Sequence, residues 1–290
     1  MKALFALLII MLAVQVSQAA SPYPPTMEGD ERQVRTSSSP EWLAAVGRFV
    51  INKRDGTGAK LCTAFLVSAN STDDSRIIMS EGHCINEWHV SGRAGNRRFS
   101  MTTHNIYFTT NTGEELKRKV VAVVGYEWSP GDHAILILDK GIYNYEIKPL
   151  VHSDEPFKNM GYGLLDDPVY QQEFKPFATA AGYSSDVPLG DGGKHLTYDE
   201  DCYLNGGMNY QKDSRCTSYR GASGGPIVVT VDRGVDEWEE RPVMGIEHLV
   251  VGIIKGGRDG DNSSTYWTPH SYYRAKLLEV FARYGVKRNY

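Results

Sequence analysis

The sequence predicts an all-β fold that ends in an α-helix, and three observations lead to this prediction. Short runs rich in β-branched and aromatic residues recur along the chain, each about as long as one strand. Clusters of Gly, Asn, Asp and Ser, which favour turns, separate the runs. In residues 272–284 the apolar positions change to helical spacing, and Gly285 follows as a helix stop. Many short strands with frequent turns are typical of a β-barrel or a β-sandwich.

The expected strands fall into two groups. In the first half of the chain we expect strands at residues 46–52, 62–67, 76–79, 106–110, 119–124 and 133–138. In the second half we expect strands at residues 177–182, 226–231, 243–254 and 264–268. The grouping predicts an N-terminal unit over residues 41–150 and a C-terminal unit, with the helix, over residues 151–290.

The N-terminus has the pattern of an export signal. Lys2 precedes an apolar run from Ala3 to Val16, and the small residues Ser17 and Ala19 follow. We predict a signal peptide over residues 1–19, removed near Ala19, and a secreted mature protein, extracellular or periplasmic, without a membrane segment. A retained anchor is the alternative, but the run is shorter than the roughly 20 apolar residues that span a bilayer.

Residues 20–40 are polar and rich in Pro and Ser, which is typical of a linker, an extended arm or a pro-segment. We expect the packed chain to begin near Glu41. Cleavage after Arg32 or Arg35 would remove a pro-segment; alternatively, both arginines belong to the mature arm.

Charge and cysteine content limit the kinds of partner. The net charge of -4 argues against nucleic-acid binding, which usually needs a basic patch. Four cysteines in an oxidising compartment predict two disulfides. Of the three pairings we favour Cys62–Cys84 and Cys202–Cys216, because each pair lies beside a motif described below. No cysteine pair has the short spacing of a structural zinc site, so we expect no metal.

One Gly-rich segment, residues 220–226 with the sequence RGASGGP, has the features of a nucleophile loop. A nucleophilic serine needs an exposed hydroxyl on a tight turn, with backbone N–H groups aimed at the developing oxyanion. Glycines on both sides allow such a backbone. We therefore take Ser223 as the candidate nucleophile and the N–H groups of Gly221 and Ser223 as the candidate oxyanion hole. A Gly-rich turn before a strand is the structural alternative.

Two segments that precede Ser223 carry candidate partners. His83 follows an apolar run in a turn of small residues, directly before Cys84. An imidazole titrates near neutral pH, as a general base must. Asp132 opens the apolar run 133–138, where a half-buried carboxylate could accept the histidine Nδ1–H. Alone, each residue is more often structural, but the chain order His83, Asp132, Ser223 matches a known catalytic triad.

Two other hydrolase classes fit the sequence less well. The α/β-hydrolases also contain G-x-S-x-G, but their acid and histidine follow the serine and their strands alternate with helices. A metal-dependent hydrolase could use His83 with Glu87 and His89, but this spacing does not match H-E-x-x-H.

These motifs resemble those of the trypsin/chymotrypsin-like serine proteases. Residues 62–67 (CTAFLV) and 80–84 (SEGHC) are similar to the family's C-x-G-x-L-[IV] and T-A-[AG]-H-C patterns, and residues 132–136 (DHAIL) resemble D-x-A-[LI]-[LI]. Residues 216–226 (CTSYRGASGGP) look most like the bacterial glutamyl-endopeptidase branch. The resemblance covers roughly residues 40–285. It implies two six-stranded antiparallel β-barrels with a C-terminal α-helix, and peptide hydrolysis through an acyl-enzyme.

The resemblance also implies the candidates for a specificity pocket, which are Thr217, Ile254, Lys255 and Gly256. Thr217 stands near the expected pocket floor and is not the Asp of trypsin, so a preference for Lys or Arg is not expected. Ile254 stands where glutamyl-specific members have His, so a preference for Glu is not carried over. Lys255 either attracts acidic side chains or lies at an exposed strand end.

Two residues depart from the family pattern. Ala222 replaces the Asp that receives the freed N-terminal ammonium in animal digestive members, so that activation switch is not expected. Glu81 stands where a small residue is usual. We expect its side chain to point outward, because burying an unpaired charge is costly. A buried Glu81 would instead perturb His83 or compete with Asp132.

Residues and resemblance together predict a secreted serine endopeptidase that acts as a monomer on protein or peptide substrates and needs no cofactor. The alternative is a catalytically impaired homologue that binds peptides or another partner. The sequons at Asn70 and Asn262 would be glycosylated only in a eukaryotic secretory route.

Overall fold

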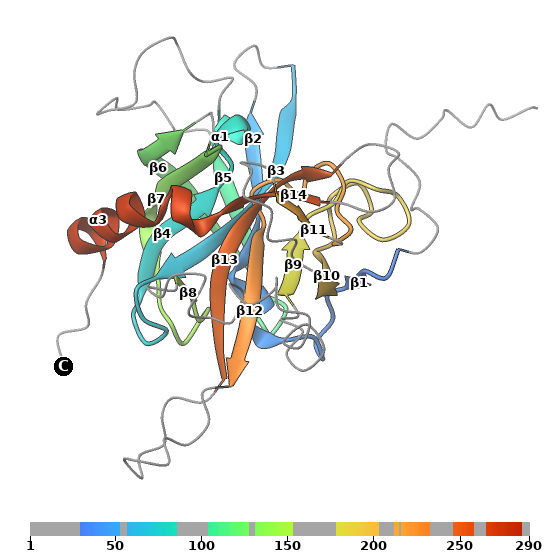
Figure 1. Ribbon diagram of the computed structural model, residues 1–290, viewed down its shortest axis with the longest axis horizontal. Coiled ribbons are helices and arrows are strands. Elements are labelled where there is room, and N and C mark those ends of the chain that lie inside the picture. The colour runs from blue at the N-terminus through green and yellow to red at the C-terminus, as the bar shows by residue number, and fades with distance from the viewer. Residues whose placement is uncertain are drawn as a thin grey trace, which may run out of the picture.

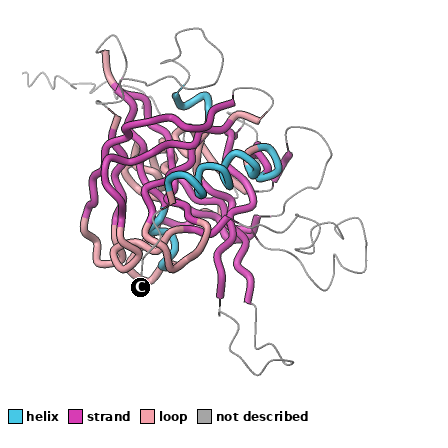
Figure 2. The backbone as a smooth tube through the Cα atoms, turned by 90° about the vertical axis from the view of Figure 1, so that its left-hand side faces the viewer, coloured by secondary structure: helices cyan, strands magenta, loops and turns pink. Residues whose placement is uncertain are grey.

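The computed structural model describes residues 30–52, 57–85, 104–127, 131–152, 178–202, 212–214, 216–232, 246–257 and 265–285. Strands dominate this part of the chain, and helices are few (Figures 1 and 2). The predicted signal peptide, residues 1–19, lies outside the described residues. Within them, no helix has the length and hydropathy needed to cross a membrane.

Six strands of the N-terminal half form a closed antiparallel barrel. They are β2 (Val46–Asn52), β3 (Ala59–Ser68), β4 (Ser75–Ser80), β5 (Asn105–Thr109), β6 (Glu115–Glu127) and β7 (His133–Ile142). Their order is β3-β2-β5-β6-β7-β4, and β4 pairs back to β3 to close the ring. Burial alternates clearly in β5, where Ile106 and Phe108 are buried while Asn105, Tyr107 and Thr109 are half-buried.

Six strands of the C-terminal half form a second sheet. They are β9 (Ala178–Gly182), β10 (Thr197–Cys202), β11 (Lys212–Ser214), β12 (Pro226–Asp232), β13 (Ile246–Gly257) and β14 (Thr265–Pro269). They pair antiparallel in the order β10-β9-β12-β13-β14-β11. The hairpin of β12 and β13 extends away from the body of the protein (Figures 1 and 2). The Cys202–Cys216 disulfide ties the end of β10 to the segment after β11.

A short strand, β8 (Leu150–His152), joins the two sets of strands. It pairs in parallel with β3 of the barrel and with β13 of the second sheet. The main hydrophobic core follows the same path, because Val228, Val250 and Ile253 of the second sheet pack into the cluster that fills the first barrel. The boundary between the two sets of strands is therefore densely packed. Residues on its two sides are held at fixed positions relative to each other.

The C-terminal helix covers the first barrel. A 3₁₀ turn, η5 (His270–Tyr272), leads into α3 (Arg274–Tyr284). The helix buries Leu277, Val280 and Phe281 in the main core, and it contacts β4 and β6. It ends where the N–H of Gly285 bonds to the carbonyl of Phe281. In Figure 1 it crosses in front of the barrel strands.

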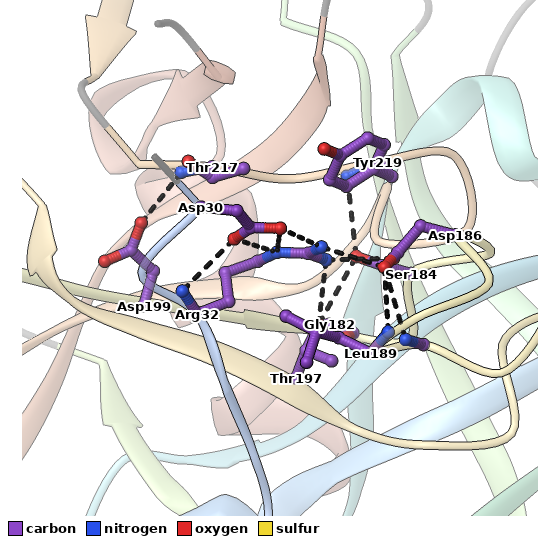
Figure 3. A network of polar contacts seen from close by, with 11 residues as sticks. Asp30, Arg32, Gly182, Ser184, Asp186, Leu189, Thr197, Asp199, Thr217 and Tyr219 are labelled. Carbon is purple, nitrogen blue, oxygen red and sulfur yellow. Dashed lines mark hydrogen bonds and ion pairs between the residues drawn. The ribbon is translucent and has the colours of Figure 1, made fainter. Parts of the chain in front are cut away.

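The N-terminal arm is packed from Asp30 onward, earlier than Glu41, where we expected packing to begin. Strand β1 (Gln33–Val34) pairs antiparallel with β10, and the 3₁₀ helix η1 (Glu41–Ala45) follows with four buried residues. The guanidinium of Arg32 makes two bonds of 3.0 Å to the Asp186 carboxylate and lies 2.6 Å from an Asp30 oxygen (Figure 3). These groups are buried, so the arm is tied into the second sheet.

The same network reaches the segment that precedes Ser223. The Arg32 guanidinium lies over the ring of Tyr219, 4.4 Å from its centre. The N–H of Ser185, next to Asp186, donates to the carbonyl of Arg220 at 2.7 Å. The arm, the loop after β9 and the segment 219–221 are thus held as one unit.

The predicted fold class is confirmed. Every expected strand is present, and the chain has a closed six-stranded antiparallel barrel, further strands and one C-terminal helix. Strands β1, β8, β10 and β11 were not predicted.

Two buried histidines should make the protein less stable in acid. Burial lowers the pKa of His133 to about 4, and burial together with the charges of His270 and Arg274 lowers the pKa of His152 to about 3. In the unfolded chain both titrate near about 6.5. Below that pH the unfolded state binds protons that the folded state does not. The contribution of the two histidines to the free energy of unfolding is therefore fully present above about pH 6.5. Below that pH it falls by about 1.4 kcal/mol per pH unit for each histidine, until its folded-state pKa of about 4 or about 3 is reached.

Denaturant unfolding at a series of pH values measures this slope. His152→Gln should make the slope between about pH 6.5 and about pH 4 shallower. His195→Gln, which changes an exposed histidine, should leave it as in the wild type. Equal slopes in the wild type and both variants would show that His152 does not cause the loss of stability in acid.

Candidate active site

The pairing of β4 with β7 brings His83 and Asp132 together. Ser80 at the end of β4 lies opposite Ala134 near the start of β7, so the residues just beyond these ends are neighbours. His83 lies on the single turn α1 (Gly82–Ile85). Its Nδ1 is 2.9 Å from Asp132 Oδ2, and its backbone N–H donates to Asp132 Oδ1 at 2.7 Å. The carboxylate therefore fixes both the ring and the backbone of His83.

Asp132 is an ionised acceptor in a buried place. Its exposed fraction is only 4%. Burial by itself would raise the pKa of Asp132, but the two hydrogen bonds from His83, the charge of His83 and the ammonium of Lys255 outweigh burial and lower that pKa below its usual value. The Asp132 carboxylate contacts Nδ1 of the His83 ring, while the His83 side chain as a whole is 23% exposed.

The loop of Ser223 has the backbone that its glycines permit. Gly221 and Gly224 have φ values of +96° and +89°, in the left-handed region that favours glycine. A Cβ on Gly221 would lie 2.4 Å from the carbonyl of Tyr183, and a Cβ on Gly224 would lie 2.1 Å from the carbonyl of Thr63. Other residue types at these two positions would disrupt the loop.

Contacts with the first barrel place Ser223 beside the segment of His83. The N–H of Thr63, on β3, donates to the Ser223 carbonyl at 2.8 Å. Cys84 Sγ is 3.7 Å from the same carbonyl. The Cys62–Cys84 disulfide, which the sequence predicted, links β3 to the turn that carries His83. The residue after His83 and the candidate nucleophile thus touch.

The Ser223 hydroxyl donates to the carbonyl of Lys255, on β13, at 3.2 Å. Among the contacts of the described residues it makes no hydrogen bond to the ring of His83. Rotation about χ1 moves a serine hydroxyl between staggered positions at little cost. Catalytic hydrogen bonds also tend to be longer without substrate than with it.

Two backbone N–H groups at the loop remain available. Within the described residues, neither the N–H of Gly221 nor that of Ser223 donates a hydrogen bond. The neighbouring donors are used: the Ala222 N–H bonds to Tyr219 and the Gly224 N–H bonds to Ile254, at 3.0 and 2.7 Å. The two groups predicted as oxyanion donors can therefore accept a new partner.

Lys255 is not at the exposed strand end that we considered. Its ammonium is half-buried and lies 3.9 Å from Asp132 Oδ2. It faces the His83–Asp132 pair, while its own carbonyl accepts from Ser223. The sequence analysis made Lys255 a pocket candidate because its segment resembles the strand that borders the specificity pocket in the family.

The other pocket candidates lie on the second sheet. Ile254 is buried opposite Trp267, and Gly256 faces open space. The N–H of Thr217 donates to the Asp199 carboxylate at 2.8 Å (Figure 3). The assignment of these residues to a substrate pocket stays a prediction.

The expectation that Glu81 points outward is wrong. Glu81 is fully buried, and neither of its carboxyl oxygens accepts a hydrogen bond among the described residues. Burial and then the charge of Asp132 raise the pKa of Glu81 well above its usual value, although the Lys255 ammonium and the Thr268 hydroxyl oppose them. The expectation rested on the cost of burying a charge. A raised pKa avoids this cost, because it favours the neutral form of the buried carboxyl group.

The described residues include two clusters of possible metal ligands, and both contain His83. The first adds Cys62 and Cys84, whose sulfurs are joined in the disulfide. The second adds Glu81 and Asp132, beside the Lys255 ammonium, which repels a cation. Glu87 and His89, weighed as metal ligands from the sequence, lie outside the described residues.

Comparison with known proteins gives the fold. No family model and no curated protein matches the sequence. Among solved structures, the chain is similar to a thermostable serine protease from an extremophilic microorganism, at 15% identity and a TM-score of 0.54, covering 84% of this chain and 99% of the other. A structure described as GrC has 13% identity and a TM-score of 0.51, covering 84% and 96%.

The fold is that of the chymotrypsin-like serine proteases. The resemblance to the glutamyl-endopeptidase branch stays a prediction. Within the chymotrypsin-like fold, Ala222 is buried in the small core of the second sheet with Ile227 and Trp267. An apolar residue suits that site.

Proposed function

We propose that this protein is a secreted serine endopeptidase that hydrolyses peptide bonds through Ser223, His83 and Asp132. The observation that carries the proposal is the pair of hydrogen bonds from His83 to Asp132, beside a glycine loop that presents Ser223. The serine-protease fold neighbours and the two disulfides support it. We expect protein or peptide substrates, a monomer and no cofactor.

Acylation follows from this arrangement. His83 Nε2 takes the proton from Ser223 Oγ as the oxygen attacks the carbonyl carbon of the scissile bond. The negative charge that develops on the carbonyl oxygen is stabilised by the N–H groups of Gly221 and Ser223. Asp132, which accepts the Nδ1–H, stabilises the imidazolium. When the C–N bond breaks, His83 gives the proton to the leaving amine, and the acyl group stays on Ser223.

Deacylation repeats the steps with water. His83 takes a proton from the water molecule as its oxygen attacks the ester carbon. The bond to Ser223 Oγ then breaks, and the proton returns to that oxygen. The carboxylic acid product leaves and the free enzyme is restored.

A second candidate function is peptide binding by a catalytically impaired homologue. The hydrogen bond from Ser223 Oγ to the Lys255 carbonyl favours it, because a hydroxyl held there is not activated. The two candidate functions differ in one property: the protease needs a Ser223 hydroxyl that His83 can activate as a nucleophile, and the peptide-binding protein does not.

Labelling with a fluorophosphonate separates them. The reagent forms a phosphorus–oxygen bond to an activated serine and releases fluoride. We expect covalent labelling of the wild type at Ser223 and no labelling of Ser223→Ala. Ser271→Ala, which changes an exposed serine, should be labelled like the wild type. A folded wild-type protein that is not labelled would favour the binding function.

A further inference from the structure

The structure leaves one polar side chain beside the candidate triad without an assigned role. Glu81 directly follows β4 and is fully buried. One of its oxygens, an Asp132 oxygen and a ring nitrogen of His83 lie within 4.8 Å of one another. Buried carboxyl groups are rarely left without a hydrogen-bond partner. The groups around Glu81 must therefore suit the protonation state of its carboxyl group.

An ionised Glu81 does not fit those surroundings. A buried carboxylate needs several donors. Among the described residues the Thr268 hydroxyl is close enough to act on Glu81 as a donor, but neither Glu81 oxygen completes a hydrogen bond. The ionised carboxylate of Asp132 is next to it, and two negative charges this close repel. The ammonium of Lys255 lies 3.9 Å from Asp132 Oδ2, and among the ion pairs of the described residues it makes none with Glu81.

A protonated Glu81 fits them. A carboxylic acid carries no charge and has one O–H donor, so it needs an acceptor instead of donors. Asp132 Oδ1 and Oδ2 each accept from His83, and each oxygen has a further lone pair. A hydrogen bond from a neutral acid to a carboxylate is charge-assisted and among the stronger ones in proteins.

We propose that Glu81 is a carboxylic acid that keeps its proton and donates its O–H to Asp132, and so acts as a positioning residue for the Asp132–His83 pair. The inference rests on the proposed function for its catalytic meaning. Lys255 complements it from β13, because its ammonium stabilises the charge of Asp132 from the other set of strands. The raised pKa of Glu81 agrees with this assignment.

The other titratable groups near Glu81 do not supply a competing charge. Tyr273, which directly precedes α3, is fully buried, and burial raises the pKa of its phenol well above the usual value, so the phenol stays neutral. Tyr126 on β6 has a pKa raised by burial and by Asp132. Glu127, at the end of β6, is half-exposed and 3.9 Å from His133. Burial, the charges of Asp132 and Lys255, and the neutral hydroxyl of Thr268 are therefore what sets the protonation state of Glu81.

Infrared difference spectroscopy tests the protonation state without catalysis. In the inactive Ser223→Ala protein near neutral pH, we expect the C=O stretching band of a buried protonated carboxyl group. The band should be absent when Glu81→Gln is added, and should persist when Glu114→Gln, an exposed matched change, is added. If the band is missing, or survives Glu81→Gln, the proposal is overturned whether or not the protein is a protease.

Kinetics test the positioning role. Glu81→Gln keeps the shape, the neutrality and a donor, so kcat should stay within a few-fold of the wild type and the acid limb of the pH profile should not move. Glu81→Leu removes the donor and should lower kcat about ten- to a hundredfold with KM little changed.

An ionised Glu81 would give a different pattern. Glu81→Gln would then remove a negative charge beside His83, make the protonated ring less stable and shift the acid limb to lower pH. Such a shift would overturn the proposal, as would equal kcat values for Glu81→Leu and Glu114→Gln. If no variant and no wild-type preparation hydrolyses peptides, the proposed function fails while the infrared result still decides the protonation state.

Discussion

Ser223→Ala should lower kcat for peptide hydrolysis about a millionfold, with KM little changed. Without Oγ there is no atom to form the acyl-enzyme, and only the oxyanion donors and substrate binding remain. His83→Ala should cost about as much, because Ser223 Oγ would then have no base. The double variant should be no worse than either single one, since the residues act as a unit.

Steady-state kinetics on a peptide substrate, found by cleavage profiling of a peptide library, measure these losses. Ser271→Ala serves as the control for an exposed serine and should retain wild-type kcat. A loss of less than about a hundredfold in Ser223→Ala would point to a nucleophile elsewhere.

Asp132→Asn should lower kcat about ten-thousandfold. The carboxylate accepts both the ring N–H and the backbone N–H of His83, at 2.9 and 2.7 Å. An asparagine amide has one acceptor and one donor end, so one of these contacts would become a donor facing a donor. The proton of the His83 ring would then sit on Nε2 instead of Nδ1. In this tautomer Nε2 presents an N–H to Ser223 and has no lone pair to take the proton of the hydroxyl.

The matched control for this change is Asp139→Asn, on the exposed end of β7, whose carboxylate accepts backbone N–H groups of Lys119 and Lys140. Its kcat should be that of the wild type. If Asp132→Asn retains kcat within about tenfold, Asp132 does not act on His83 as proposed.

The main strands were predictable because they are short runs rich in β-branched and aromatic residues, separated by clusters of turn residues. Strand β2 was predicted at its observed bounds, Val46–Asn52, since this run contains Phe49, Val50 and Ile51 and is followed by turn residues such as Asp55 and Gly56. The strands that were missed give no such signal. Strand β8, Leu150–His152, is too short to show a period, and its pairing with β3 and β13 is a long-range feature.

The arrangement of the candidate site was predictable only in part. The order of His83, Asp132 and Ser223 gave the candidates, and the antiparallel pairing of β4 with β7 explains why the first two meet. The environment of Glu81 was not predictable, because a carboxyl group can be buried by losing its charge as well as by gaining a partner. The direction of Lys255 depends on an irregularity in the pairing of β13 with β14 between Ile254 and Gly256, which the residue type of Lys255 does not encode.

The buried guanidinium of Arg32 limits how the protein can be processed. A cut in the backbone after this residue would release it with the fragment and leave Asp186 as an uncompensated charge in the interior. Breaking a buried pair in this way typically costs about 3–5 kcal/mol, a large part of the about 5–15 kcal/mol that holds a domain folded. We therefore expect a chain trimmed before Asp30 to stay more stable toward unfolding than a chain that has lost Arg32.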